Sequence, residues 1–244
     1  MGKILLTNDD GINAEGIFFL WEKLREFADV IIVAPDKERS GSGHALTLKT
    51  ALKYQEMRKD GKIHAYSVSG TPVDCVRLAA EFLVKDEIDL VVSGINNGAN
   101  MGINLHYSGT VAAALEAAIL GIPGVAVSIA SPSPENYESA MIFGEKIVKY
   151  VLASPNPSVV LNVNVPARPV EQIKGILVTK QALTEVESNL GTHIMAHPKK
   201  DEIENTTDIW FDTNAVLANY VSITPIGIDL TKHNYITQLS NYEW

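Results

Sequence analysis

Hydrophobic and polar positions along the chain follow two alternating periods, one typical of strands and the other of helices. Short apolar runs predict strands buried on both faces, at 3–8, 30–35, 88–94, 122–128 and 159–165. Between these runs, apolar residues three and four positions apart predict helices, at 16–27, 71–83, 109–120 and 135–153. Strands that alternate with helices over short connections predict an α/β fold with a doubly wound, mostly parallel, Rossmann-like sheet.

Two parts of the chain depart from this alternation. Residues 46–56 and 62–69 alternate between polar and apolar positions and predict a more exposed hairpin. Toward the C-terminus, strand-like segments at 174–180 and 220–224 are separated by the polar stretch 184–208.

These differences suggest how the chain is organised. We expect residues 1–165 to form the α/β core that carries the site. Residues 166–244 are expected to form a β-rich C-terminal extension and oligomerisation arm, not an independent domain. Tyr235, Tyr242 and Trp244 lie near the end of the chain, where apolar surface often marks a contact with a partner.

The first predicted strand ends in Asn8-Asp9-Asp10-Gly11. Two adjacent carboxylates at the end of a buried strand repel each other unless a cation offsets their charge. Ligands bind at this end of the strands in open α/β sheets, and hard oxygen donors without a Cys/His cluster favour Mg²⁺ or Mn²⁺ over zinc. The alternative is structural, because Asp caps helices and Asn-Asp-Asp-Gly suits a turn. One Asp would satisfy a cap, so the second favours a metal site.

A second polar segment follows the strand at 30–35. It contains small and polar residues in series, namely Ser40, Gly41, Ser42, Gly43 and His44. The glycines let the backbone approach a ligand closely, and successive N–H groups there would suit an anion. The segment fits neither a G-x-G-x-x-G dinucleotide motif, because Leu46 occupies the third glycine position, nor a G-x-S-x-G nucleophile elbow. A flexible surface loop is the alternative.

A third, Asn- and Gly-rich loop is predicted at 95–108 and contains Asn96. It is longer than the roughly 2–6 residues usual for such connections, which favours a functional loop over a purely architectural one. The loop ends in Ser108-Gly109-Thr110 at a predicted helix start, where N–H groups and two hydroxyls would hold a phosphate. Ser108 acting only as a helix cap is the alternative.

Composition and charge narrow the range of partners. A net charge of −9 and a pI near 5.1 argue against binding of nucleic-acid polymers. A small phosphorylated substrate is still compatible with this negative charge, because one metal ion locally reverses the electrostatic field. Cys75 is the only cysteine, which excludes an internal disulfide and a thiolate zinc site. With no apolar stretch of membrane-spanning length and no signal peptide, we expect a cytoplasmic protein without a membrane partner.

A family resemblance is carried by runs in order along nearly the whole chain, at 4–11, 33–40, 70–76, 92–102, 107–111, 161–166 and 220–225. Together they resemble the SurE family, stationary-phase survival proteins that act as metal-dependent 5′/3′-nucleotidases. The resemblance implies one divalent metal ion per subunit, Mg²⁺ or Mn²⁺, held by Asp9, Asp10, Ser40 and Asn96. It also implies C-terminal arms exchanged between subunits, and therefore a homodimer or homotetramer.

The resemblance weakens toward the C-terminus. Thr179 is followed by Lys180, where family members often carry arginine, and 184–208 lacks the Arg/Gly-rich and aromatic run typical of the family. These departures concern substrate range and arm contacts, not the metal centre.

The predicted activity is hydrolysis of nucleoside monophosphates, as a 5′-nucleotidase, with 3′-nucleotides and polyphosphate as further substrates. Asp9 and Asp10 are the predicted catalytic residues: Asp10 anchors the metal, and Asp9 also orients or deprotonates the attacking water. The candidate phosphate- and substrate-binding residues are Asn8, Gly41, Ser42, Gly43, His44, Asn96, Ser108, Gly109 and Thr110. His44 is either an acid for the leaving group or a loop histidine without a catalytic role.

Two other functions stay open at this point. A phosphatase that forms an aspartyl-phosphate also begins with an acidic strand end, although its D-x-D pattern requires an acid two positions on, where Gly11 and Ile12 stand. A non-catalytic nucleotide-binding stress module would bind the same ligand without releasing phosphate.

Overall fold

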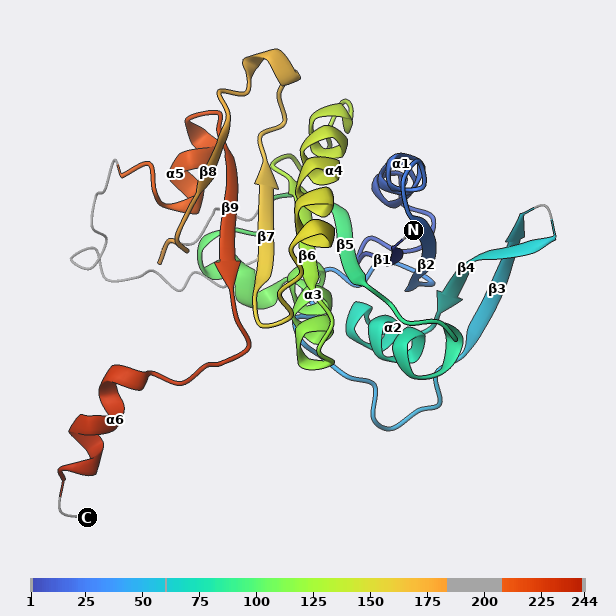
Figure 1. Cartoon of the computed structure of the whole chain (residues 1–244), viewed down its shortest axis with the longest axis horizontal. Coiled ribbons are helices and arrows are strands. Elements are labelled where there is room, and N and C mark those ends of the chain that lie inside the picture. The colour runs from blue at the N-terminus through green and yellow to red at the C-terminus, as the bar shows by residue number, and fades with distance from the viewer. Residues whose placement is uncertain (1, 60, 184–207, 243–244) are drawn as a thin grey trace, which may run out of the picture.

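A computed structural model describes residues 2–59, 61–183 and 208–242 of the chain (Figure 1). These residues form a nine-stranded sheet in the order β3-β4-β2-β1-β5-β6-β7-β9-β8. The strands are β1 (Lys3–Thr7), β2 (Asp29–Pro35), β3 (Tyr54–Lys59), β4 (Lys62–Val68), β5 (Leu90–Asn97), β6 (Gly124–Ile129), β7 (Val160–Val165), β8 (Ile176–Val178) and β9 (Val221–Ile226). The six strands from β4 to β7 in this order run parallel, which confirms the predicted α/β fold.

The central strand β1 lies at the point where the strand order reverses. Leu5 pairs with Ile31 of β2 on one side and with Val91 of β5 on the other. From β1 the chain moves outward through β2 to the edge strand β3, comes back to β4, and then crosses to β5 on the other side of β1. Open α/β sheets bind ligands at the carboxyl ends of strands that flank such a reversal. The acidic pair follows β1, and Asn96 lies near the end of β5, so both are at this place.

Helices cover both faces of the sheet. They are α1 (Glu15–Leu24), α2 (Pro72–Leu78), α3 (Gly109–Ile119), α4 (Glu138–Ala153) and α5 (Asp212–Leu217); a further helix, α6 (His233–Ser240), lies away from these layers. Leu20 of α1 belongs to the same core cluster as Leu6 of β1, and α4 packs in this layer too. Val76 of α2 belongs to a second cluster with Leu5, together with residues of α3. Because successive strand residues point to opposite faces, the two helical layers bury alternate residues of β1.

The predicted helix start at Thr71 is confirmed by a capping box. Thr71 Oγ1 accepts a hydrogen bond from Asp74 N–H over 3.1 Å, and Thr71 N–H donates to Asp74 Oδ2 over 2.9 Å. Pro72 occupies the first turn, where its missing N–H costs nothing. A π-helical turn, η1 (Ala79–Leu83), continues α2.

β5 extends further than its apolar run predicted. The run ends at Gly94, but the strand continues because Asn96 and Asn97 pair with Ser128 and Ile129 of β6. The expectation that Asn96 lies in a loop was therefore wrong, and a strand end holds this residue instead. The remaining loop includes a 3₁₀ helix, η2 (Gly102–Tyr107).

The predicted hairpin forms as β3 and β4, but its first strand begins at Tyr54 and not near residue 46. Side-chain contacts hold part of the segment before it. Thr47 donates from its N–H and its hydroxyl to the two carboxylate oxygens of Asp74, over 2.9 and 2.6 Å. The segment is therefore tied to the start of α2 where the sequence predicted a strand.

The C-terminal strands continue the same sheet. β9 pairs antiparallel with β7, and β8 pairs parallel with β9. The short helix α5, which packs against β9, was not predicted, because six residues give no clear helical period. Residues 184–207 of the predicted polar stretch, and Trp244, lie outside the described residues.

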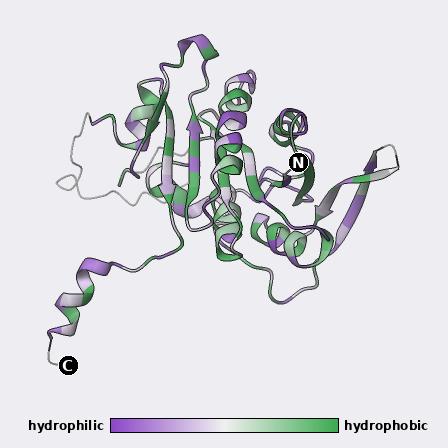
Figure 2. Ribbon diagram, viewed as in Figure 1, coloured by the Kyte–Doolittle hydropathy of each residue, from purple (hydrophilic) through white to green (hydrophobic). Residues whose placement is uncertain are grey.

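α6 lies apart from the sheet (Figure 1) and was also not predicted. All of its residues are exposed, and Figure 2 shows hydrophobic and hydrophilic residues interspersed along it. A short connection after β9 leads to this helix. In the described part of the chain, no helix is both long and apolar enough to span a membrane.

Candidate functional site

Segments from different parts of the sequence meet at the carboxyl end of β1. Arg39 N–H, in the segment after β2, donates to the carbonyl oxygen of Asp9 over 2.7 Å. Further along this segment, Gly43 N–H donates to the carbonyl oxygen of Tyr107 over 3.0 Å, just before α3. The turn after β1, the segment after β2 and the start of α3 are therefore joined by direct contacts.

Asp9 lies against the first turn of α3. It is 4% exposed, and its Oδ1 accepts a hydrogen bond from the Thr110 hydroxyl over 2.5 Å. A Cβ atom at position 109 would lie 3.0 Å from Asp9 Oδ2 and 2.7 Å from Ser42 Oγ. Glycine therefore lets α3 begin this close to both side chains. Asp9, Ser42 and the start of α3 form one wall of the candidate site.

Asn8 shapes the turn that presents the two acids. Its Nδ2 donates to the Gly11 carbonyl oxygen over 3.0 Å, and its Oδ1 accepts from Gly11 N–H over 3.2 Å. Gly11 has a φ of +98°, which non-glycine residues rarely adopt. Asn8 and Gly11 thus form the turn that was the structural alternative. The side chains of Asp9 and Asp10 take no part in it and make other contacts.

Asp10 is oriented by the end of β5. Its Oδ2 accepts a hydrogen bond from Asn97 N–H over 3.2 Å, and the Tyr137 hydroxyl donates to Asn97 Oδ1 over 2.8 Å. The Tyr137 ring stacks on Phe19, with ring centroids 5.1 Å apart. Neither Asn97 nor Tyr137 was among the predicted site residues. Asn97 belongs to the Asn-rich motif and could have been included, whereas no sequence signal pointed to Tyr137.

The site concentrates negative charge. Burial raises the pKa of Asp9, although hydrogen bonds from Thr110 act in the opposite direction. Burial also raises the pKa of Asp10, to about 6, and the neighbouring charge of Asp9 adds to this effect. Glu38 raises the pKa of both carboxyls further. A divalent cation is the kind of group that would offset this repulsion, so the charge distribution fits a metal site.

The shift at Asp10 predicts how the stability of the metal-free protein depends on pH. Between about pH 4 and pH 6 the folded state keeps a proton on Asp10 that the unfolded state releases, so stability should fall as pH rises through this window. The whole effect is at most about 3 kcal/mol. Asp10→Asn cannot lose a proton and should be more stable than the wild type at pH 8 but not at pH 4. Urea unfolding in EDTA at both pH values measures this, and an equal difference at both would contradict it.

The other two predicted metal ligands offer neutral oxygens. Ser40 follows Arg39, whose N–H contacts Asp9, and Asn96 lies on β5, which pairs with β1. Ser40 Oγ donates to Glu38 Oε1 over 2.7 Å. Asn96 is 8% exposed, and its Nδ2 donates to the Gly98 carbonyl oxygen over 2.8 Å, which leaves its Oδ1 to bind a ligand. Within the described ranges, no three His, Cys, Asp or Glu side chains cluster as a metal-binding group. Any metal site there would therefore combine the two carboxylates with neutral oxygen donors.

Ser42 and His44, in the segment after β2, differ in their surroundings. The buried hydroxyl of Ser42 has no hydrogen-bond partner among the described residues. Such a group is costly unless a ligand or water satisfies it, and its place beside Gly109 suits a phosphate oxygen. His44 instead faces α3, where its Nε2 lies 2.6 Å from Oε2 of the buried Glu116. Glu116 was not predicted as a site residue, because its position within an alanine-rich helix gave no signal.

The start of α3 shows the capping role that the sequence left open. Ser108 Oγ accepts a hydrogen bond from Val111 N–H over 3.1 Å. The Thr110 N–H precedes this capped position and interacts with the Asp9 carboxylate, and Gly109 lies against the Asp9 side chain. Ser108 is thus a helix cap, and the phosphate-binding role predicted for it stays a prediction.

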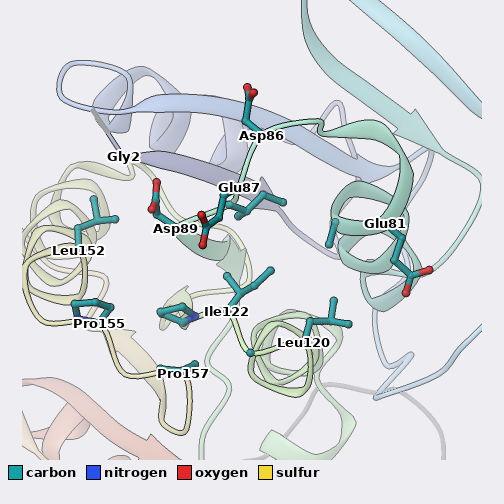
Figure 3. Close-up of a pocket in the computed structure, with 14 residues that line it drawn as sticks. Gly2, Glu81, Asp86, Glu87, Asp89, Leu120, Ile122, Leu152, Pro155 and Pro157 are labelled. Atoms are coloured by element: carbon teal, nitrogen blue, oxygen red, sulfur yellow. The ribbon is translucent and has the colours of Figure 1, made fainter.

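A separate cleft lies at the opposite ends of the strands. It has a volume of about 790 Å³, and its lining includes Gly2, Ile88, Asp89, Ile122, Leu152 and Pro157 (Figure 3). These residues lie near the amino ends of the strands and include none of the predicted site residues. This cleft is therefore distinct from the candidate site.

Comparison with known proteins finds relatives that match nearly the whole length of the chain. The profile of the family "Survival protein SurE" matches residues 4–188. A protein from Natranaerobius thermophilus named "5'-nucleotidase SurE" is 42% identical, over 99% of both chains. One of the same name from Geobacter metallireducens is 42% identical, over 99% of this chain and 98% of the relative.

A solved structure agrees with these sequence comparisons. The "Crystal Structure of Sure Protein from Aquifex aeolicus" superimposes with a TM-score of 0.82 at 36% identity, and the match covers 98% of each chain. Similarity over the full length, in both sequence and fold, confirms the resemblance that the motifs carried. The chain belongs to the SurE family.

Proposed function

We propose that this protein is a metal-dependent 5′-nucleotidase that hydrolyses nucleoside monophosphates. The observation that carries the proposal is the contact between the buried Asp9 and the first turn of α3, at the reversal of the strand order. This arrangement puts an acidic pair that suits a cation beside a helix start that suits a phosphate. The names of the relatives, "5'-nucleotidase SurE", support the same activity.

The residues that would hold the metal are Asp9, Asp10, Ser40 and Asn96. They offer two carboxylates, a hydroxyl and an amide oxygen, which are the donors that Mg²⁺ and Mn²⁺ prefer. One bound ion per subunit would neutralise charge on the phosphoryl group and lower the pKa of a water molecule.

The chain's own residues would position the reactants. Gly109 and Thr110 at the start of α3, with Ser108, Gly41, Ser42 and Gly43, would hold phosphate oxygens. The buried Ser42 hydroxyl, which has no hydrogen-bond partner in the described ranges, supports this role. Asp9 would orient the attacking water and accept its proton at Oδ2, since Oδ1 is engaged by Thr110. Asn8 would act by fixing the turn that carries the acids.

A phosphate-release panel tests this proposal. Purified protein with Mn²⁺ or Mg²⁺ should release phosphate from 5′-nucleoside monophosphates, and 3′-nucleotides and polyphosphate in the same panel establish the substrate range. Binding of nucleotide without release would identify a non-catalytic binding module. A covalent adduct trapped by borohydride reduction would identify an aspartyl-phosphate intermediate and contradict direct attack by water.

The proposal extends to assembly as a homodimer or homotetramer. Tyr235, Ile236 and Leu239 on α6 are 47%, 49% and 42% exposed, although a helix of this length is rarely stable without packing of its apolar side chains. A neighbouring subunit would cover these residues if the C-terminal arms cross between subunits, which is consistent with a closed symmetric assembly. The cytoplasmic location expected from the sequence stays a prediction.

Removal of α6 should weaken this assembly. Light scattering at micromolar concentration should find the full-length protein as a dimer or tetramer, and a chain ending at Leu230 shifted toward monomer. A full-length monomer, or a truncated chain with an unchanged oligomeric state, would show that α6 does not hold subunits together.

A further inference from the structure

A buried carboxylate joins three elements behind the candidate site. Glu116 on α3 is only 2% exposed, and it has a partner on each of its oxygens. Arg77 Nη1 of α2 donates to Oε1 over 2.7 Å, and His44 Nε2 lies 2.6 Å from Oε2. Burial alone would raise the pKa of Glu116, but His44 and Arg77 outweigh it, and the net shift is downward. A buried carboxylate that is ionised and paired on both oxygens holds its partners in fixed positions.

His44 is the only one of these partners in the segment that carries Ser40 and Ser42. This segment is tied to the site by Arg39 N–H, which donates to Asp9, and by Gly43 N–H, which donates to Tyr107. Beyond His44, the Ala45 carbonyl oxygen accepts from the Thr71 hydroxyl over 2.7 Å. His44 is thus the point at which a side chain fastens the segment to α3, the same helix whose first turn contacts Asp9 and Ser42.

We propose that Glu116 is a positioning residue for the reaction: through His44, it holds residues 40–43 against Asp9 and the start of α3. The inference rests on the proposed nucleotidase function for its activity readout. Because Glu116 and Gly109 belong to one rigid helix, the contact fixes the distance between the Ser42 hydroxyl and the phosphate-binding turn. His44 serves in this role as a hydrogen-bond donor, so any side chain that donates to Glu116 should replace it in part.

A different role for His44 gives opposite expectations. A carboxylate on one ring nitrogen is also how enzymes orient a histidine that transfers protons. If His44 protonated the leaving group, its loss would matter for a nucleoside, which is a poor leaving group, and little for p-nitrophenolate, which leaves without protonation. A glutamine at position 44 could donate a hydrogen bond to Glu116 but could not act as an acid.

The test compares four variants, with 5′-AMP and p-nitrophenyl phosphate as substrates. His44→Ala and Glu116→Gln should lower kcat/KM for both substrates by a similar factor, about 10-fold, as expected for loss of a charge-assisted hydrogen bond. His44→Gln should recover most of the loss. Glu81→Gln is the matched control, because it removes the exposed partner of Arg77 and should change nothing.

Two measurements without turnover complete the test. Hydrogen exchange of the peptide covering 37–48, in EDTA, should be faster in His44→Ala than in the wild type and the control. Mn²⁺ binding, measured by calorimetry, should weaken in the same variant because Ser40 lies in the loosened segment. These readouts stay informative if the wild type hydrolyses neither substrate, which would refute the proposed function alone.

Three results would overturn the inference. One is a loss confined to 5′-AMP that His44→Gln does not recover, which would assign His44 to proton transfer. Another is an unchanged exchange rate at 37–48 in His44→Ala. The third is unchanged activity toward both substrates in a folded His44→Ala variant. This result can be obtained even if Glu116→Gln does not fold.

Discussion

Asp9→Asn should abolish phosphate release from 5′-nucleotides while the protein stays folded. Asparagine has nearly the same shape, so the Thr110 contact and the packing against Gly109 can persist. It lacks the negative charge that would hold a metal and the basic oxygen that would take a proton. Loss of a proton-transfer group alone costs about 10²- to 10⁴-fold in rate, and weaker metal binding would add to this. Steady-state phosphate release measures the loss, and circular dichroism reports the fold.

The matched control for this variant is Asp86→Asn. Asp86 is an exposed acid that pairs with Lys3 at the opposite ends of the strands, so its replacement should leave turnover unchanged. An Asp9→Asn variant with more than a tenth of wild-type activity would contradict the assigned role of Asp9.

Thr110→Ala should reduce kcat/KM by roughly 10- to 100-fold, the value of one buried hydrogen bond to a charged group. The Thr110 hydroxyl donates to Asp9 Oδ1 over 2.5 Å, and Thr110 itself is fully buried. Without this donor, Asp9 loses both a fixed orientation and a group that lowers its pKa. Thr110→Ser keeps the hydroxyl and should retain most of the activity. Parallel measurements of kcat/KM and Mn²⁺ affinity separate a loss of phosphate binding from misplacement of Asp9.

Equal losses in Thr110→Ala and Thr110→Ser would show that the methyl group and its packing matter, not the hydroxyl. Full activity in Thr110→Ala would show that the contact with Asp9 has no part in the reaction.

The sequence predicted much of the core because local pattern decides it. Buried parallel strands such as β1 and β2 appear in the sequence as continuous apolar runs. The helix cap at Thr71 is predictable because Thr71 and Asp74, three positions apart, can bond to each other's backbone. The acidic pair could also be located from local pattern. Two adjacent negative charges directly after a buried strand are unfavourable, so their presence there indicates a function. The doubly wound topology then places the end of β1 beside the end of β5.

What the sequence did not predict depends on partners distant along the chain. Glu116 pairs with His44 across 72 positions, and the Tyr137 hydroxyl reaches Asn97 across 40. A glutamate among alanines, or a tyrosine at a helix start, has no local pattern that reveals such a partner. β5 continues to Asn97 because of its pairing with β6 and not because its residues are apolar. α6 spans only eight residues and none of them is buried, so the segment is too short to identify a helix from its pattern alone.

We expect nucleotide hydrolysis to depend on one divalent metal ion held by the acidic pair after β1. Phosphate release from 5′-AMP by EDTA-treated protein, before and after Mn²⁺ is added back to excess, tests this dependence most directly. We expect no release in EDTA and recovery with Mn²⁺, with one ion bound per subunit in a parallel calorimetric titration. Full activity in EDTA, or one bound Mn²⁺ per subunit without any release of phosphate, would contradict it.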